Sequence, residues 1–266
     1  MNTSSTAIPA PLYVVGLGPG DPGLLAPETL ACLETSRTVA GYSGYISLLD
    51  PELLRGKYII STGMRAELQR VDAALDSALG GHITSVVCSG DPGIYAMAGL
   101  VFERMELRGL QIPVEVVPGI PALCSAAALL GAPLMHDFAC VSLSDLLTPW
   151  ETIVRRLDCA LAGDFVLVLY NPRSKRRTLQ LEEALSLGLS HRPGGTPVGI
   201  VRNARRQGQA CAIVPLEQVD PERVDMLSLL IIGNASSRIV PGTGAEPLSW
   251  EGGARMVTPR GYHNKY

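Results

Sequence analysis

A glycine-rich turn stands directly after the first apolar run of the chain, at residues 16–22 (GLGPGDP). Glycine adopts backbone conformations that are closed to other residues, so this turn can bend sharply and bring bare backbone against a ligand. Asp21 followed by Pro22 is typical of a helix start. The turn does not match a dinucleotide-binding loop, because Asp21 occupies the third glycine position and Gly41, not an acidic residue, ends the second apolar run.

Two further turns rich in glycine and proline follow later apolar runs, at residues 89–95 (SGDPGIY) and 117–122 (VPGIPA). Gly90 would permit close approach of a ligand, and the Asp91 carboxylate could accept hydrogen bonds from ribose hydroxyls or an amino group. Ligands of open α/β sheets bind beyond the carboxyl ends of the strands. Each turn alone could be purely structural, but three of them at strand ends predict one shared cofactor pocket.

The elements that would position these turns alternate between short apolar runs and amphipathic stretches. The strands expected in the first half of the chain are residues 12–15, 39–40, 58–60, 83–88 and 114–117, and the helices are residues 22–35, 65–79, 94–110 and 121–130. Strand–helix–strand alternation predicts a mostly parallel sheet that is covered on both faces.

The alternation restarts in the second half of the chain. Strands are expected at residues 138–142, 165–170, 198–201, 210–214 and 229–232, with a helix near residues 179–187. Thr148 as N-cap, Pro149 in the first turn and Glu151 as the capping-box partner predict another helix start. The predicted domains are a loose tail (1–10), an N-terminal α/β domain (11–130), a linker (131–137), a C-terminal α/β domain (138–239) and an irregular tail (240–266).

Composition excludes several classes of protein. The six cysteines are scattered without a CxxC pair, so we expect buried, reduced thiols in a cytoplasmic protein and no metal site. The formal net charge of −3 argues against a nucleic-acid-binding protein. No apolar run is long enough for a membrane span, and residues 1–10 lack the features of a secretory signal.

The three turns, in this order, resemble those of the tetrapyrrole-methylase family, and the resemblance extends from residue 12 to about residue 237. It implies an α/β class III methyltransferase of two domains with mixed, mostly parallel sheets and S-adenosylmethionine in the interdomain cleft. Within the family, four strings are most similar to the precorrin-3B C17-methyltransferases of cobalamin biosynthesis: residues 41–45 (GYSGY), 143–150 (LSDLLTPW), 170–177 (YNPRSKRR) and 258–262 (TPRGY).

The resemblance also implies which residues bind the cofactor, S-adenosyl-L-methionine, and its product, S-adenosyl-L-homocysteine. The expected cofactor-binding residues are Pro19, Gly90, Asp91, Ile94, Tyr95, Pro121, Ala122, Tyr170 and Asn171. Many relatives carry Thr or Ser where Pro121 and Ala122 stand, so contacts from these two are expected from the backbone. No metal is needed, because the sulfonium donor carries its own activation.

The implied substrate is an anionic tetrapyrrole with many acetate and propionate groups. Arginine binds carboxylates in bidentate geometry, and basic residues crowd two loops of the second domain, at residues 173–177 and 202–206. Solvated surface charge is the competing explanation for each loop. The expected substrate-binding residues are Gly18, Tyr42, Arg173, Lys175, Arg176 and Arg202.

The implied reaction methylates C17 of precorrin-3B and contracts the ring to give precorrin-4. Holding the donor and acceptor carbons in attack geometry can contribute about 7–11 kcal/mol. Ring contraction needs a base, for which Asp145, Ser144 and His136 are the candidates.

Several alternatives stay open. The substrate could contain cobalt, as cobalt-precorrin-3 of the anaerobic pathway does, or the chain could be a sister methylase that acts at another ring position. A corrinoid-binding protein without catalytic activity is the non-enzymatic alternative. The family resemblance also implies a homodimer.

Overall fold

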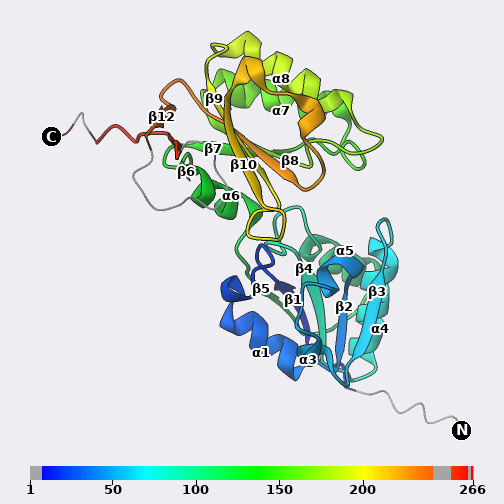
Figure 1. The fold of residues 1–266 in the computed structure, drawn as a ribbon. Helices are drawn as coiled ribbons and strands as arrows, with labels where there is room; N and C mark the ends of the chain where they lie inside the picture. Colours follow the sequence, from blue (N-terminus) through cyan, green and yellow to red (C-terminus); the bar gives the residue numbers. More distant parts are fainter. Residues whose placement is uncertain (1–7, 242–252, 263–264, 266) are drawn as a thin grey trace, which may run out of the picture. The chain divides into compact units, whose positions relative to one another are not determined.

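The computed structural model describes residues 8–241, 253–262 and 265, and the chain divides into two compact units, residues 1–122 and 123–266 (Figure 1). Each unit is built on its own five-stranded sheet. Because residues 131–137 lie inside the second unit, the segment predicted as a linker does not separate the two units.

The first unit contains a sheet in which every neighbouring pair of strands is parallel, in the order β3-β2-β4-β1-β5. Its strands are β1 (Leu12–Gly16), β2 (Thr38–Tyr42), β3 (Tyr58–Thr62), β4 (Thr84–Cys88) and β5 (Val114–Val117). β4 is buried along its whole length, as expected of a central parallel strand. The apolar runs of the sequence predict all five strands, with slightly different ends.

Helices cover both faces of this sheet. α4 (Glu67–Leu79) and α5 (Ala98–Arg108) share a core with Val14 and Val86. The helices α1 (Pro27–Thr35), α2 (Ser43–Ile46) and α3 (Pro51–Leu54) pack around Val15 and Val87 on the opposite face. Since successive side chains of a strand point to opposite faces, β1 and β4 each contribute to both cores.

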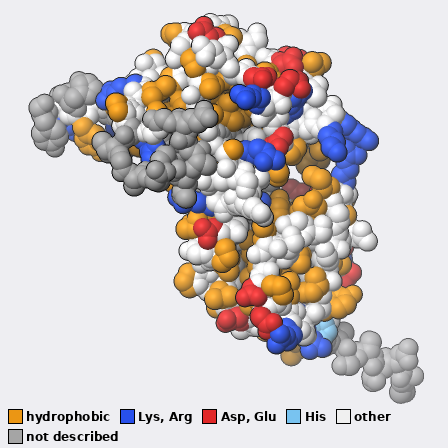
Figure 2. Space-filling view, viewed as in Figure 1, with side chains coloured by type: hydrophobic (Ala, Val, Ile, Leu, Met, Phe, Trp, Pro, Cys, Tyr) orange, Lys and Arg blue, Asp and Glu red, His pale blue; other side chains and the backbone are white. Residues whose placement is uncertain are grey.

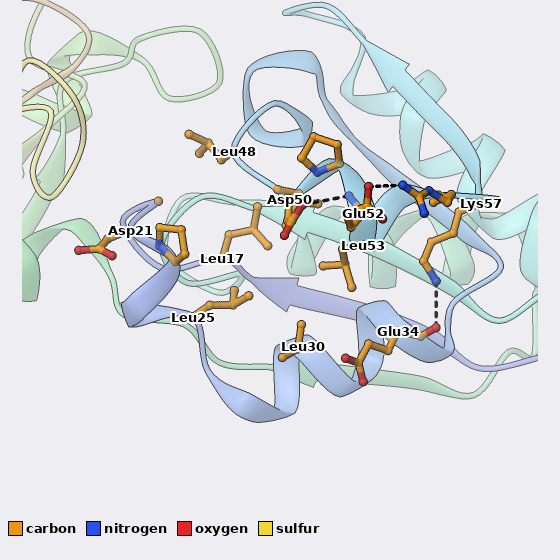
Figure 3. A pocket seen from close by; sticks show the side chains of 15 residues that line it. Leu17, Asp21, Leu25, Leu30, Glu34, Leu48, Asp50, Glu52, Leu53 and Lys57 are labelled. Carbon is orange, nitrogen blue, oxygen red and sulfur yellow. Dashed lines mark hydrogen bonds and ion pairs between the residues drawn. The ribbon is translucent and has the colours of Figure 1, made fainter.

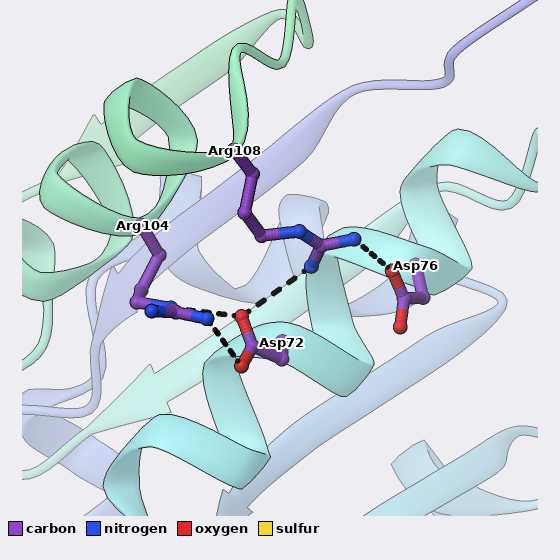
Figure 4. A network of polar contacts seen from close by, with 4 residues as sticks. All are labelled: Asp72, Asp76, Arg104 and Arg108. Carbon is purple, nitrogen blue, oxygen red and sulfur yellow. Dashed lines mark hydrogen bonds and ion pairs between the residues drawn. The ribbon is translucent and has the colours of Figure 1, made fainter.

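Ion pairs join α4 to α5 (Figure 4). Arg104 donates two hydrogen bonds to the Asp72 carboxylate, at 2.9 and 2.8 Å. Arg108 donates to Asp72 at 3.3 Å and to Asp76 at 2.5 Å. These contacts fix the helix that follows the β4 turn against the helix that precedes β4.

Three helices of the first unit begin later than the sequence predicts, and the smallest difference is that of α4, which begins at Glu67 rather than residue 65. Residues predicted to open the first helix form a separate 3-10 turn, η1 (Pro22–Leu24), and α1 begins at Pro27. Ala26 is extended (φ −64°, ψ 139°) because proline disfavours the helical conformation in the residue before it. α5 begins at Ala98 rather than residue 94, after turns that include Tyr95 with a positive φ of 52°.

The second unit contains a mixed sheet in the order β10-β9-β11-β8-β7. Only β7 and β8 pair in parallel, so the prediction of mostly parallel sheets is confirmed in the first unit and wrong in this one. Its strands are β7 (Phe138–Ser142), β8 (Val166–Tyr170), β9 (Pro197–Arg202), β10 (Ala210–Pro215) and β11 (Ser228–Ile232). No α-helix connects β9, β10 and β11, and strands joined without a helical crossover favour antiparallel pairing.

Among the described residues, three α-helices belong to the second unit or lead into it: α6 (Ala122–Leu130), α7 (Trp150–Ala162) and α8 (Leu179–His191). α7 and α8 share a core with β8 and β9, and two 3-10 turns, η2 (Leu216–Gln218) and η3 (Pro221–Arg223), follow β10. The predicted capping box is wrong. Pro149 is the N-cap residue, its extended backbone (φ −56°, ψ 140°) delays the helix to Trp150, and no side chain caps it.

A small third sheet corrects two domain predictions. β12 (Arg238–Val240), β13 (Arg255–Val257) and β6 (Gly131–Ala132) form it in the order β12-β13-β6. The predicted linker therefore contains a strand, and the tail predicted as irregular contains β13, which the fully buried side chains of Met256 and Thr258 anchor. Residues 1–7 and 242–252, which belong to the two predicted tails, lie outside the described residues.

Candidate cofactor and substrate site

The first two glycine-rich turns are joined by backbone hydrogen bonds. β1 lies next to β4 in the sheet, and just beyond the strand ends Gly18 and Gly90 form an isolated antiparallel bridge. The Gly18 amide donates to the Gly90 carbonyl at 3.1 Å, and the Gly90 amide donates to the Gly18 carbonyl at 2.7 Å. Both residues have positive φ, 64° and 67°, which explains the need for glycine at these positions.

The third turn packs directly against the other two. A Cβ atom on Gly16 would lie 2.6 Å from the Gly119 amide nitrogen and 2.6 Å from the Gly90 carbonyl oxygen, closer than real Cβ contacts allow. The Asp91 carboxylate completes the junction, since Oδ1 accepts from the Gly93 amide at 2.8 Å and Oδ2 accepts from the Gly119 amide at 3.2 Å. The three turns lie together, as the sequence predicts.

The remaining first-unit candidates lie in these three turns, except Tyr42, which lies at the end of β2. Pro19 is buried, Ile94, Pro121 and Ala122 are half-buried, and Tyr95 is exposed. Tyr42 ends β2, and its ring meets the Tyr45 ring edge to face with centroids 5.2 Å apart. Asp91 already uses one lone pair on each oxygen to hold the turns, which leaves further acceptor capacity for a ligand.

The candidates of the second unit gather where β7 and β8 end. Ser142 and Tyr170 are partners in these parallel strands. Asn171 follows with a positive φ of 50°, and its side-chain amide donates to the Ser142 hydroxyl at 2.9 Å. The Tyr170 hydroxyl accepts from the backbone amide of Leu123 at 3.0 Å, and so it contacts the residue that follows Ala122.

Two of the three candidate bases lie at the same strand end. The Ser144 amide donates to the Ser142 hydroxyl at 3.2 Å, and Asp145 accepts at 2.8 Å from the side-chain amide of Gln180 on α8. His136 precedes β7 instead, and its Nδ1 accepts from the amide of Asp137 at 2.8 Å. Since a strand rises about 3.3 Å per residue, the length of β7 separates His136 from this group. The structure does not bring His136 together with the other two candidates.

The four cationic candidates divide into two kinds. Arg173 forms an ion pair with Glu222 and donates to the Pro221 carbonyl at 2.9 Å, and Arg202 donates to Asp225 at 2.8 Å. Both are therefore engaged by acidic residues that sequence reasoning missed. No sequence signal could have found these partners, because each pair joins residues far apart in the chain.

Lys175 and Arg176, in contrast, are exposed. Neither side chain has a hydrogen-bond or ion-pair partner in the part of the chain that the structure describes. In Figure 2, most of the basic side chains visible on this face of the molecule lie over the second unit. Unpaired cations of this kind can take up substrate carboxylates without first breaking an internal ion pair.

A hollow of about 850 Å³ lies in the first unit between the first glycine-rich turn, α1 and residues 48–57 (Figure 3). Leucines form much of its wall, and its rim carries Asp21, Glu34, Asp50 and Glu52. The Lys57 ammonium on the rim donates to two backbone carbonyls, and Arg55 pairs with Glu52. This acidic rim does not suit an anionic tetrapyrrole.

All six cysteines are free thiols, and the expectation that they are buried holds for Cys88 but is wrong for Cys124 and Cys159, which are exposed. No group of three or more His, Cys, Asp or Glu side chains among them could hold a metal ion, and no described helix is long and apolar enough to cross a membrane. Burial raises the pKa of the Cys88 thiol to about 12, so this cysteine at the end of β4 stays protonated and acts as core packing.

Known proteins that are similar to this chain are methylases of tetrapyrroles. A sequence profile of the tetrapyrrole (corrin/porphyrin) methylases matches residues 11–220. The probable cobalt-factor III C(17)-methyltransferase of Salmonella typhimurium is 41% identical over 251 residues, which are 94% of this chain and 99% of that protein. The precorrin-3B C(17)-methyltransferase of a Sinorhizobium species is 39% identical over 256 residues, 94% of this chain and 96% of that protein.

Solved structures are similar over most of the chain as well. The crystal structure of the methyltransferase CobJ matches with a TM-score of 0.84 and 36% identity, covering 94% of this chain and all of that one. The uroporphyrin-III C-methyltransferase of Thermus thermophilus, in complex with S-adenosylhomocysteine, matches with a TM-score of 0.63 and 26% identity over 84% of this chain and 97% of that one. From the profile match and these near full-length similarities, the chain belongs to the tetrapyrrole (corrin/porphyrin) methylase family.

Proposed function

We propose that this chain is an S-adenosylmethionine-dependent methyltransferase that acts at C17 of precorrin-3B and contracts its ring to give precorrin-4, in cobalamin biosynthesis. The observation that carries the proposal is the similarity of 39–41% identity, over nearly the whole chain, to proteins named as C17-methyltransferases. The similarity to CobJ over the full length of that structure supports it further.

A cobalt-containing substrate is the second candidate. The relative from Salmonella is named for cobalt-factor III and the relative from Sinorhizobium for precorrin-3B, and their identities to this chain are almost equal, 41% and 39%. Identity therefore does not separate a metal-free from a metallated substrate, and both belong in the test.

The cofactor would be held mainly by backbone. The turns of the first unit present glycine backbone beside the Asp91 carboxylate, and Asn171 presents a side-chain amide in the second unit. Donors and acceptors of these kinds fit the hydroxyl, amino and carboxylate groups of S-adenosylmethionine. The structure of the Thermus relative with S-adenosylhomocysteine supports the choice of cofactor.

The chemistry divides between the cofactor and the protein. When bound, S-adenosylmethionine supplies an electrophilic methyl group, so the task of the protein is to hold and align the donor against the ring carbon. The junction of the three turns is suited to this task, because its backbone cannot rotate away as a side chain can. We assign the base of ring contraction to Asp145, which Gln180 holds in place at 2.8 Å.

Lys175 and Arg176 are proposed to bind the substrate's carboxylates, since they are exposed and have no side-chain partner among the described residues. Arg173 and Arg202 could contribute only by exchanging Glu222 and Asp225 for substrate groups. We further propose a cytoplasmic homodimer that binds neither nucleic acid nor membrane. Light scattering after size-exclusion chromatography tests the oligomeric state.

The decisive experiment supplies the purified protein with S-adenosylmethionine carrying a ¹³C-methyl group. Precorrin-3B and cobalt-factor III are offered in parallel, and the products are analysed by mass spectrometry and ¹³C NMR. We expect one labelled methyl at C17 of a ring-contracted product. Label at another ring carbon would identify a sister methylase, and binding of the tetrapyrrole without label would favour a corrinoid-binding protein.

A further inference from the structure

Arg177 is a buried cation next to the candidate site. Its side chain lies in the loop between β8 and α8, and the residue is only 7% exposed. One terminal nitrogen, Nη2, donates to the Asn171 carbonyl at 2.6 Å and contacts the Met226 sulfur at 3.4 Å, while the buried Nε has no partner. Burial lowers the pKa of this guanidinium, and the Asp145 carboxylate opposes that shift. Burying an incompletely paired cation is unfavourable, so we asked what the buried Arg177 guanidinium contributes to the structure.

The Arg177 guanidinium holds the backbone of the turn that contains Asn171. Asn171 has a positive φ of 50°, in the left-handed region that asparagine adopts more readily than most residues other than glycine. The loop is closed by two more hydrogen bonds, from the Ser174 amide to the Arg177 carbonyl at 2.9 Å and from the Arg177 amide to the Ser174 hydroxyl at 3.1 Å. The arginine therefore fixes the peptide of Asn171 from inside the loop.

Ser142 holds the same residue from the neighbouring strand. Its hydroxyl oxygen accepts from the Asn171 side-chain amide at 2.9 Å and from the Ser144 backbone amide at 3.2 Å. With its backbone fixed by Arg177 and its side chain fixed by Ser142, Asn171 has one orientation. Its amide oxygen keeps no partner among the described residues and remains available to a ligand.

We propose that Ser142 and Arg177 are positioning residues that fix the Asn171 side chain in its binding orientation before the cofactor arrives. The inference rests on the proposed function, in which Asn171 binds S-adenosylmethionine. Holding a binding group in place beforehand reduces the conformational entropy lost on binding, which raises affinity without any additional contact to the ligand.

A second buried arginine supplies a matched control. Arg192 is 6% exposed, its Nε also lacks a partner, and burial lowers its pKa as well. Its two terminal nitrogens donate to the carbonyls of Phe165 and Gly233. Phe165 precedes β8, whereas Asn171 follows it, so Arg192 serves the opposite end of the same strand. Replacing either arginine by lysine removes the same kind of buried guanidinium.

The test measures S-adenosylhomocysteine affinity by calorimetric titration and Tm by thermal unfolding, for the wild type and four variants. Ser142→Ala and Arg177→Lys are each expected to weaken binding about 10-fold, the effect of one lost hydrogen bond. Ser142→Thr keeps the hydroxyl and should restore binding to within about two-fold of the wild type. Arg192→Lys should lower Tm about as much as Arg177→Lys does. Its affinity for S-adenosylhomocysteine should stay within about two-fold of that of the wild type.

Two results would overturn the inference. Wild-type affinity in Ser142→Ala would show that the Ser142 hydroxyl does not orient the side-chain amide of Asn171. Ser142→Ala retains the buried arginine, so this result can be obtained even if Arg177→Lys does not fold. Equal weakening by Arg192→Lys and Arg177→Lys would show that a buried guanidinium acts only through general stability. If the wild type itself does not bind S-adenosylhomocysteine, the proposed function fails and the inference fails with it. If the wild type binds and Ser142→Ala and Arg177→Lys bind with the same affinity, the inference alone is rejected.

Discussion

Gly16→Ala should disrupt the candidate cofactor site, because all three turns meet at this residue. The new Cβ would lie 2.6 Å from the Gly119 nitrogen, 2.6 Å from the Gly90 oxygen and 2.7 Å from the Gly119 Cα, whereas ordinary contacts begin at 3.4 Å. All three atoms belong to the backbone, so no side chain can rotate away. The turns must instead move apart by about 0.8 Å, the difference between these distances.

That displacement sets the expected magnitude. Overpacking a close contact costs about 1–3 kcal/mol, and loss of the Gly18–Gly90 bridge would add about 1 kcal/mol for each hydrogen bond. The lower entropy of alanine in the unfolded chain offsets about 0.4–1 kcal/mol of this. We expect a net loss of about 2–4 kcal/mol in the free energy of unfolding. Because misplacing reacting groups by about 1 Å can slow a reaction about 100-fold, methyl transfer should slow by a similar factor. S-adenosylhomocysteine affinity should fall as well, because the displaced turns are the proposed binding groups.

Urea unfolding and calorimetric titration with S-adenosylhomocysteine measure the changes in stability and affinity. Gly99→Ala is the matched control, because Gly99 lies in α5 and a Cβ there meets nothing within 4 Å. It should stabilise the chain by about 0.5–1 kcal/mol, through helix propensity, and leave binding unchanged. The reasoning is refuted if Gly16→Ala unfolds at the wild-type urea concentration or binds S-adenosylhomocysteine with wild-type affinity.

Stability, ring contraction and substrate capture should each respond to a different substitution. The hydrogen bond from Arg104 lowers the pKa of Asp72, so its stabilisation is complete above the unfolded carboxyl pKa of about 3.9 and is lost as pH falls through the folded pKa. Asp72→Asn should cost about 1 kcal/mol at neutral pH, since the pair is partly exposed, and thermal unfolding should show no difference from the wild type at low pH. Asp145→Asn should slow ring contraction about 100-fold in single-turnover assays and leave S-adenosylhomocysteine affinity within about two-fold; unchanged turnover would remove Asp145 as the base. Lys175→Ala combined with Arg176→Ala should raise the KM for the tetrapyrrole about 10-fold and weaken its dependence on ionic strength, and a KM equal to that of the wild type would contradict their role.

The sequence predicts the first unit well because its signals are local. A parallel sheet needs strands that are apolar on both faces, and β4 is such a strand. Parallel order also places all strand ends at one edge, so glycine-rich turns after β1, β4 and β5 must approach one another. The meeting of Gly16, Gly90 and Gly119 follows from this geometry, although the contact distances do not.

The second unit is harder to predict because its decisive interactions are non-local. Apolar runs locate its strands but carry no information on direction, which the connections between β9, β10 and β11 decide. The ion pair of Arg173 with Glu222 joins residues 49 positions apart, so the sequence does not reveal it. This pair partly neutralises the basic loop that the sequence predicts to bind the substrate. His136 stands near Asp145 in the sequence but is held apart from it by a strand.

Two identical strings in the first unit show how far local pattern extends. Residues 20–23 and 90–93 both read GDPG, and in both the aspartate Oδ1 accepts from the amide of the following glycine, at 2.9 Å for Asp21 and 2.8 Å for Asp91. Only Asp91 also reaches the third turn, through Oδ2 and the Gly119 amide. The β4 turn pairs with the β1 turn through the Gly18–Gly90 bridge, and β1 lies between β4 and β5 in the sheet, so Asp91 stands close to the turn that follows β5. The GDPG segment at residues 20–23 therefore forms only the turn that starts a helix, whereas the one at residues 90–93 also links two turns. The neighbouring strands in the sheet determine this difference.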